Sequence, residues 1–151
     1  MDVLNPMLAM IAWSGCVMAM LMATRIPVVL KYWGKLQQAM HSDEMRPKLP
    51  AKMRYVTDNY NHLLEQPTLF YATVVYIHLV GTATALTVSL AWAYVASRVV
   101  HSIVQLSVNN VSWRAAIFAL SSLMLLALIL IEVITGLGRS VVDQSIDLTM
   151  R

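Results

Sequence analysis

The chain has 151 residues, of which 58% are hydrophobic and only 13% are charged. A soluble domain usually carries about 25% charged residues, so this composition excludes an ordinary soluble protein and indicates an integral membrane protein. The net charge of +3 is not gathered on an amphipathic face with aromatic residues, which argues against nucleic-acid binding. The single cysteine, Cys16, excludes a disulfide framework, and no metal-binding motif is present. We expect Cys16 to be a small buried hydrophobic residue.

The first apolar run covers residues 3–24, which contain no charged side chain. Its length is enough for one transmembrane helix, which we expect over about residues 3–30. Asp2 stands where a signal peptide would carry positive charge, so the run is expected to be a retained span. Arg25 follows the run at the expected membrane surface, where such a side chain can extend into water.

A polar connection is predicted over residues 34–58. Pro47 and Pro50 argue against one continuous helix in this segment. The segment is rich in Lys and Arg, so the positive-inside rule assigns it to the cytoplasm. Both termini are then expected on the opposite side of the membrane.

The second and third helices are predicted from residues 66–97, which contain no Asp, Glu, Lys or Arg. A single helix over this range would be about 48 Å long. The hydrocarbon core of a bilayer is only about 30 Å thick, so the run must fold back on itself. Residues 81–84, Gly-Thr-Ala-Thr, form the natural break. We therefore expect helices over about residues 55–80 and 85–108.

The last span is predicted over about residues 112–137, with Gly136 and Gly138 as stop signals. Glu132, near the far end of this span, is expected to be a packing or interfacial group. The predicted fold is an all-α integral membrane protein, in which residues 1–151 form one domain with a bundle of four transmembrane helices.

Two opposite charges are predicted to lie at similar depth on neighbouring helices. Glu65 lies about 24 Å from the turn at residues 81–84, and Arg98 lies about 21 Å from it, at 1.5 Å per helical residue. Because the two helices are antiparallel neighbours, this placement predicts an Arg–Glu ion pair across the hairpin. Such a pair could serve only to hold the helices together, and this structural reading remains the alternative.

The polar side chains around this pair predict a pocket at the cytoplasmic end of the bundle. On the third helix, four polar residues are spaced four, three and four apart and share one face: Tyr94, Arg98, His101 and Gln105. On the second helix, Asn61 or His62 shares a face with Glu65, and Arg25 and Arg114 lie at the same membrane surface. A cationic pocket there suits an anionic, water-borne ligand that meets an apolar co-substrate from the lipid.

Two segments of the chain resemble the MAPEG family, the membrane-associated proteins in eicosanoid and glutathione metabolism. The first is LLEQPTLFYA at residues 63–72, and the second is AYVASRVVHS at residues 93–102. Four short spans, with a cytoplasmic connection after the first, extend the likeness over most of the chain. The first segment looks like a bacterial branch of the family, which implies a bacterial inner membrane.

The resemblance implies a homotrimer of four-helix subunits that binds glutathione between neighbouring subunits, near the cytoplasmic face. Arg114 matches the family arginine implicated in stabilising the glutathione thiolate, which makes it the expected catalytic residue. An arginine has this effect because a nearby cation stabilises a thiolate. Residues expected to bind glutathione, or another anionic ligand, are Arg25, Asn61, His62, Glu65, Tyr94, Arg98, His101 and Gln105. Glu65 would contact the amino end of glutathione.

Three positions depart from the family pattern. His62 stands where the family has Asn, Gln105 where the eicosanoid enzymes have Tyr, and Ala115 where the prostaglandin branch has Ser. These departures argue against a prostaglandin activity.

We therefore expect a transferase or peroxidase that uses glutathione as co-substrate and acts on a lipophilic electrophile from the surrounding lipid. The alternative is a non-catalytic membrane protein that binds an anionic lipid, or an accessory or assembly subunit of a larger complex. The departures at His62 and Gln105 favour this alternative. A channel or transporter is disfavoured because residues 74–90 offer few polar groups for a pathway.

Overall fold

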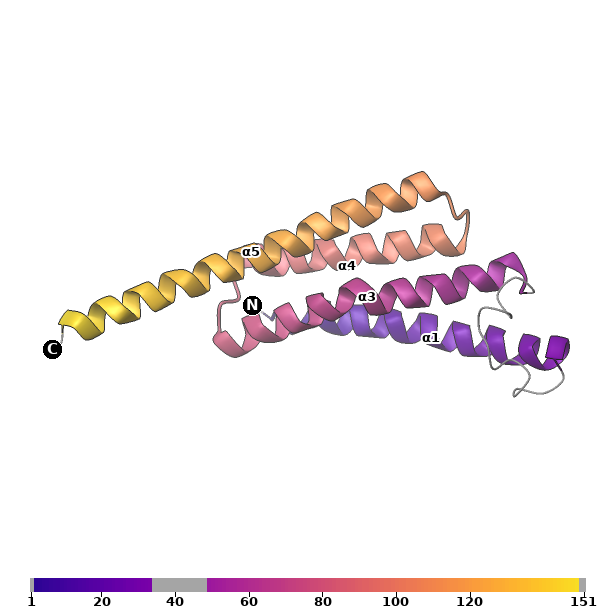
Figure 1. The fold of residues 1–151 in the computed structure, drawn as a ribbon, viewed down its shortest axis with the longest axis horizontal. Coiled ribbons are helices and arrows are strands. Elements are labelled where there is room, and N and C mark those ends of the chain that lie inside the picture. The colour runs from indigo at the N-terminus through magenta and orange to yellow at the C-terminus, as the bar shows by residue number, and fades with distance from the viewer. Residues whose placement is uncertain (1, 34–48, 150–151) are drawn as a thin grey trace.

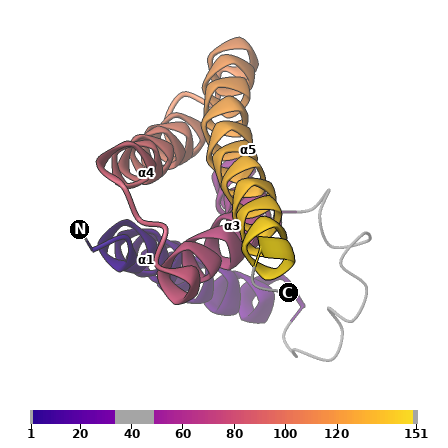
Figure 2. The same ribbon diagram turned by 90° about the vertical axis from the view of Figure 1, so that its left-hand side faces the viewer.

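Four helices form one elongated bundle in the computed structural model, which describes residues 2–33 and 49–149 (Figure 1). The helices are α1 (Leu4–Trp33), α3 (Ala51–Val80), α4 (Ala85–Leu106) and α5 (Val111–Thr149). Consecutive helices run in opposite directions, so the α3–α4 turn and the α4–α5 turn lie at opposite ends. We call these the Gly81 end and the Asn109 end of the bundle. Figure 2 shows the helices grouped around a common axis, with α1 packed mainly on α3 and α4 mainly on α5.

Three of the four helices, α1, α4 and α5, contain stretches that are long and apolar enough to cross a membrane. Large apolar side chains cover their outer surfaces, for example Leu8 on α1 and Leu123 on α5, each 63% exposed. The sequence predicted four spans, but α3 does not reach the same apolarity because its first half carries charged residues such as Arg54 and Glu65. It nevertheless runs along the bundle beside the other three helices.

The start of α3 differs from the prediction. The helix begins at Ala51 rather than near residue 55, directly after Pro50, which occupies the N-cap position. A proline fits there because the first backbone N–H groups of a helix have no intrahelical acceptor. The predicted polar connection is therefore helical from residue 51 onward, and its earlier part, with Pro47, lies outside the described residues.

The predicted end of the last helix is wrong. Gly136 and Gly138 do not stop α5, which continues to Thr149 and extends beyond the other helices at the Gly81 end. A glycine inside a helix costs only about 1 kcal/mol relative to alanine, and no proline follows to force a stop. Glycine ends a helix reliably only when its backbone adopts the left-handed conformation, and neither residue does.

The α3–α4 turn has the sequence determinants of a tight helix connection, as predicted. Gly81 adopts a left-handed backbone with φ of 70°, which ends α3, and the backbone N–H of Thr82 donates to the carbonyl of Ile77 at 3.1 Å. Thr84 caps α4 reciprocally with Thr87: Thr84 Oγ1 accepts from the Thr87 N–H at 3.2 Å, and Thr87 Oγ1 accepts from the Thr84 N–H at 2.9 Å. The turn therefore fixes the relative heights of α3 and α4.

Cys16 is exposed in the single chain, contrary to the prediction that it is buried. The buried stripe of α1 includes Met10 and Val17, which lie seven residues apart and face the bundle, and Val3 just before the helix continues it. Cys16 lies one residue away from this stripe, and a step of one residue turns a helix by about 100°. The apolar run did not reveal this orientation, because α1 is apolar on all sides.

Candidate functional site

A cavity of about 290 Å³ lies at the Asn109 end, between α3, α4 and α5. Its walls are formed by His62, His101, Val111, Arg114, Ala115 and Phe118. Three of the predicted site residues therefore meet in one place: two imidazoles and one guanidinium. We call this cavity the Arg114 pocket.

Two amide side chains hold the guanidinium of Arg114. Nη1 of Arg114 donates to Oδ1 of Asn109 at 2.6 Å. With its amide oxygen turned toward Arg114, Gln105 accepts from Nη2 at 3.0 Å and from the backbone N–H of Asn59 at 3.3 Å. Within the part of the chain that the structure describes, no carboxylate pairs with Arg114, and its buried Nε–H has no acceptor. The positive charge is therefore fixed in position without a carboxylate partner among the described residues.

The two histidines form the wall opposite this cation. Their rings meet edge to face, with centroids 6.1 Å apart. Nδ1 of His62 lies 3.2 Å from Oε2 of Glu65, whose side chain is 65% exposed at the rim. Because Nδ1 is engaged by the carboxylate, His62 keeps Nε2 for contacts with a ligand. His101 is buried, and its ring also packs against Phe118.

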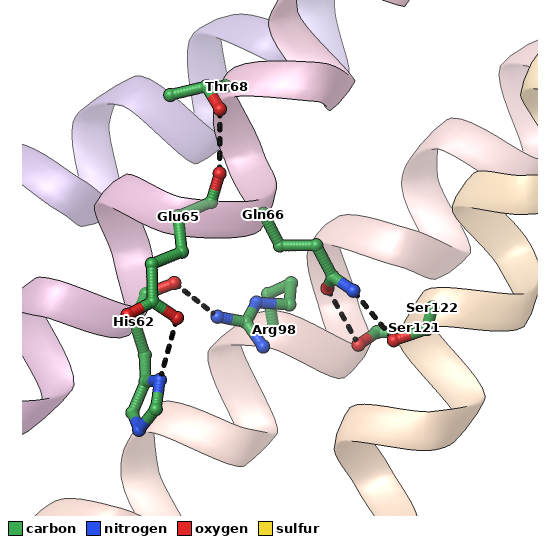
Figure 3. A network of polar contacts seen from close by, with 7 residues as sticks. All are labelled: His62, Glu65, Gln66, Thr68, Arg98, Ser121 and Ser122. Atoms are coloured by element: carbon green, nitrogen blue, oxygen red, sulfur yellow. Dashed lines mark hydrogen bonds and ion pairs between the residues drawn. The ribbon is translucent and has the colours of Figure 1, made fainter.

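Arg98 is fully buried, and Figure 3 shows its guanidinium directed toward the backbone of His62 on α3. Its Nη2 donates to the carbonyl oxygen of His62 at 2.8 Å, and its guanidinium lies 5.6 Å from the centroid of the Phe118 ring. The Nε–H and Nη1 groups of Arg98 have no acceptor among the described residues. A buried cation with unused donors is costly, so its retention points to a role beyond packing.

The predicted Glu65–Arg98 ion pair does not form. The two residues do lie at neighbouring levels of α3 and α4, as the helical rise predicted. Each of them, however, binds a different group of His62 (Figure 3). Arg98 binds the backbone carbonyl and Glu65 binds the imidazole. The physical reason is the rotation of α3, which leaves Glu65 exposed on the outside of the single chain and spares its charge the cost of burial beside Arg98.

The remaining predicted residues do not line the Arg114 pocket. Asn61 is exposed on α3, on the same outward face as Glu65. Tyr94 is buried one turn from Arg98 and stacks on Phe70, with ring centroids 4.5 Å apart. Arg25 is half-buried on α1 and is absent from the pocket wall. Gln105 acts on the pocket only through Arg114.

Three residues of the site were missed by the sequence analysis. Asn109 holds Arg114, Phe118 lines the cavity and lies near the guanidinium of Arg98, and the backbone N–H of Asn59 donates to Gln105. Phe118 follows Arg114 by four residues, a spacing that puts both on one helical face and could have revealed it. Asn59 gave no such signal, because only the packing of α3 on α4 decides that it points inward, where its Nδ2 donates to Ser102 at 2.5 Å.

A side-chain amide also fixes α5 against α3 beside the pocket. Nε2 of Gln66 donates to Oγ of Ser122 at 2.6 Å, and Oγ of Ser121 lies 3.5 Å from Oε1 of Gln66 (Figure 3). Side-chain hydrogen bonds between membrane helices stabilise one relative position of the two helices. This bridge therefore sets the height at which α5 presents Arg114.

Comparison with known proteins gives one positive result. The model of the MAPEG family matches residues 3–134, nearly the whole chain and every residue of the Arg114 pocket. Comparisons with curated proteins and with solved structures found no match. Three helices apolar enough to cross a membrane, in a membrane-protein family, identify a multi-pass integral membrane protein. The chain therefore belongs to the MAPEG family.

Proposed function

We propose that the protein is a glutathione-dependent transferase or peroxidase that acts on lipophilic electrophiles at the cytoplasmic face of a membrane. The family includes glutathione transferases and peroxidases. The observation that supports this activity most directly is the guanidinium of Arg114, which amides hold in a pocket and no described carboxylate neutralises. An anion as small as a thiolate could balance this charge.

The residues of the Arg114 pocket suit thiol activation. Arg114 would stabilise the glutathione thiolate by direct charge contact. His62, whose Nδ1 is held by Glu65, can accept the thiol proton at Nε2 as a general base. In the transferase reaction, the thiolate sulfur then forms a bond to the electrophilic carbon, and the leaving group departs with its electron pair. The apolar wall at Val111 and Phe118 is suited to a lipophilic co-substrate.

The rest of glutathione would extend beyond the pocket, and we propose that a homotrimer completes its site. Asn61 and Glu65 are both exposed on one face of α3 next to the pocket, so a neighbouring subunit could cover them. Arg25 is the cation proposed to bind a glutathione carboxylate, and the buried Arg98 is proposed to favour anion binding through its charge alone. In this arrangement Glu65 would contact both His62 and the amino end of glutathione.

The test is a comparison of Arg114→Ala with wild-type protein, using chlorodinitrobenzene as the electrophile. Loss of one preorganised charge contact to the developing anion typically lowers kcat by about 100-fold or more. We expect that fall, with a much smaller change in the glutathione Kd. Arg139→Ala, at the opposite end of the bundle, is the matched control and should leave both unchanged. A loss of glutathione affinity with kcat unchanged for Arg114→Ala would show that Arg114 only binds.

A second candidate is a non-catalytic protein that binds an anionic lipid head group in the same pocket. It is favoured by the fact that Glu65 and Arg98 are already engaged by His62, which leaves fewer free groups for a peptide ligand. A thermal-stability titration separates the two functions, since a ligand of the folded state raises stability as its concentration exceeds Kd. Stabilisation by an anionic phospholipid but not by glutathione would select the second candidate.

A further inference from the structure

A second cavity of about 410 Å³ lies at the Gly81 end, between α3 and α5. It is lined by Ala72, Thr73, Tyr76, Ile129, Glu132 and Val133. None of these residues belongs to the Arg114 pocket, and the proposed reaction uses none of them. We call this cavity the Glu132 pocket.

Glu132 is buried, with 5% of its surface exposed, although it lies on a membrane-spanning helix. Its Oε2 accepts a hydrogen bond from Oγ1 of Thr82 at 2.6 Å. No described residue donates to Oε1, and no described cation lies within ion-pair distance of the carboxylate. A carboxylate in a membrane helix is costly without a cationic partner, so residues of this kind mark binding sites more often than packing contacts.

The other groups around the cavity leave Glu132 as its one charged anchor among the described residues. The hydroxyl of Thr73 is committed to the carbonyl of Leu69 at 2.8 Å. Tyr76 lies at the level of Glu132, and its hydroxyl approaches Gly136 of α5, where a Cβ would lie 3.5 Å from Oη. The apolar side chains of Ala72 and Ile129 lie one turn closer to the middle of the bundle. The cavity is therefore anionic at its outer end and apolar at its inner end.

We propose that the Glu132 pocket binds a single-chain lipophilic amine, with the ammonium group paired to Glu132 and the apolar part over Ala72 and Ile129. An ammonium ion supplies the cation and the hydrogen-bond donors that Oε1 lacks. The order of charges argues against an aminophospholipid. Arg139, the next cation on α5, is seven residues, or about 10 Å, further toward the Gly81 end. In an aminophospholipid the ammonium group lies farther from the middle of the bilayer than the phosphate. Here Arg139, which would bind the phosphate, lies farther out than Glu132, which would bind the ammonium group.

The test measures binding of dodecylamine and dodecanol to the full-length protein in phosphatidylcholine vesicles, as the shift in the midpoint of thermal unfolding. Dodecylamine is expected to stabilise the wild-type protein saturably. The dodecylamine concentration that gives half of the maximal shift should be no more than one-tenth of the dodecanol concentration that does so. Glu132→Gln keeps the size of the side chain and an acceptor for Thr82 but removes the charge. It should weaken dodecylamine binding at least tenfold and leave dodecanol binding unchanged. Arg114→Ala should bind dodecylamine like the wild type, which separates this result from any failure of the proposed activity.

A second variant keeps the test decisive if Glu132→Gln does not fold. Ala72→Leu narrows the apolar part of the cavity and leaves the carboxylate intact, so it should also weaken dodecylamine binding. Equal stabilisation by dodecylamine and dodecanol, or unchanged dodecylamine binding in Ala72→Leu, would overturn the proposal. Stabilisation by phosphatidylethanolamine vesicles without any response to dodecylamine would overturn it in favour of a lipid head group. A change of oligomeric state in Ala72→Leu, with no amine binding in the wild type, would show that a second copy of the chain fills the cavity.

Discussion

Asn109 and Arg114 are joined by a hydrogen bond of 2.6 Å between Oδ1 and Nη1, so a residue of the α4–α5 turn holds the central cation of the candidate site. Asn109 also has a positive φ of 50°, a conformation that asparagine tolerates better than most other residues with a side chain. One residue thus shapes the turn and aims the guanidinium. The geometry of the pocket therefore depends on the turn as well as on the helices.

The two roles of Asn109 can be separated by substitution. Asn109→Gly retains the backbone conformation and loses the acceptor, whereas Asn109→Asp retains both. We expect Asn109→Gly to fold normally but to lower kcat with glutathione and chlorodinitrobenzene by about tenfold, which corresponds to one lost hydrogen bond of about 1.4 kcal/mol. Asn109→Asp should also lower kcat, because its carboxylate would neutralise the charge of Arg114 that the thiolate needs. If Asn109→Gly matches the wild type in kcat, the hydrogen bond does not position Arg114 for the reaction.

The buried side chain of Arg98 is expected to make the protein less stable than an apolar side chain of similar size would. It is buried without a carboxylate partner among the described residues, and replacing buried charges by apolar side chains of similar size often stabilises a protein by about 1–4 kcal/mol. Arg98→Met should therefore raise the midpoint of thermal unfolding in detergent while weakening glutathione binding. Arg139→Met is the matched control, because Arg139 also donates to a backbone carbonyl, that of Val80. Arg139 is exposed, so its replacement should change the stability by less than about 0.5 kcal/mol. A lower midpoint for Arg98→Met would mean that the residue is mainly structural.

Backbone conformation predicts opposite effects at two glycines, Gly138 within α5 and Gly81 at the end of α3. Gly138 lies inside α5 with open space around its Cα, so Gly138→Ala should stabilise the protein by up to about 1 kcal/mol. Gly81 has φ of 70°, so Gly81→Ala should destabilise it by about 1 kcal/mol, although nothing crowds its Cα either. The measurement is the shift in thermal midpoint for each variant. Destabilisation by Gly138→Ala would indicate that α5 ends there after all.

The buried hydrogen bond between Asn59 and Ser102 should contribute to the packing of α3 on α4. A double-mutant cycle with Asn59→Ala and Ser102→Ala is expected to give a coupling energy of about 0.6 kcal/mol, the average for such bonds between membrane helices, and no more than about 1.7 kcal/mol. The matched control is the exposed Asn61→Ala combined with Ser102→Ala, which should show no coupling. A coupling near zero in the first pair would mean that the amide finds another partner when Ser102 is removed.

Much of the site could be predicted because helical spacing is a local property. The interval from Tyr94 to Gln105 placed the polar residues of α4 on one face, and all of them are buried on that face. The turn at residues 81–84 also set the heights of Glu65 and Arg98 correctly. What the spacing could not provide was the direction in which each face of α3 points, because Asn59 and Asn61 are equally polar in sequence. Packing on α4 selects Asn59 for the interior and leaves Asn61 outside.

The sequence by itself determined that this is a helical membrane protein of the MAPEG type, where its chain turns, and which polar residues share a helix face. The family assignment comes from the resemblance of residues 63–72 and 93–102 to MAPEG proteins. The other properties follow from composition, apolar run length and the 3.6-residue period, which act within one segment at a time. The tertiary structure alone decided that Arg114 is held by Asn109 and Gln105, that His62 separates Glu65 from Arg98, and that Glu132 faces a cavity. Those outcomes depend on how each helix is rotated and how far it is shifted along its neighbours. Only side-chain packing between segments distant in sequence fixes these two quantities.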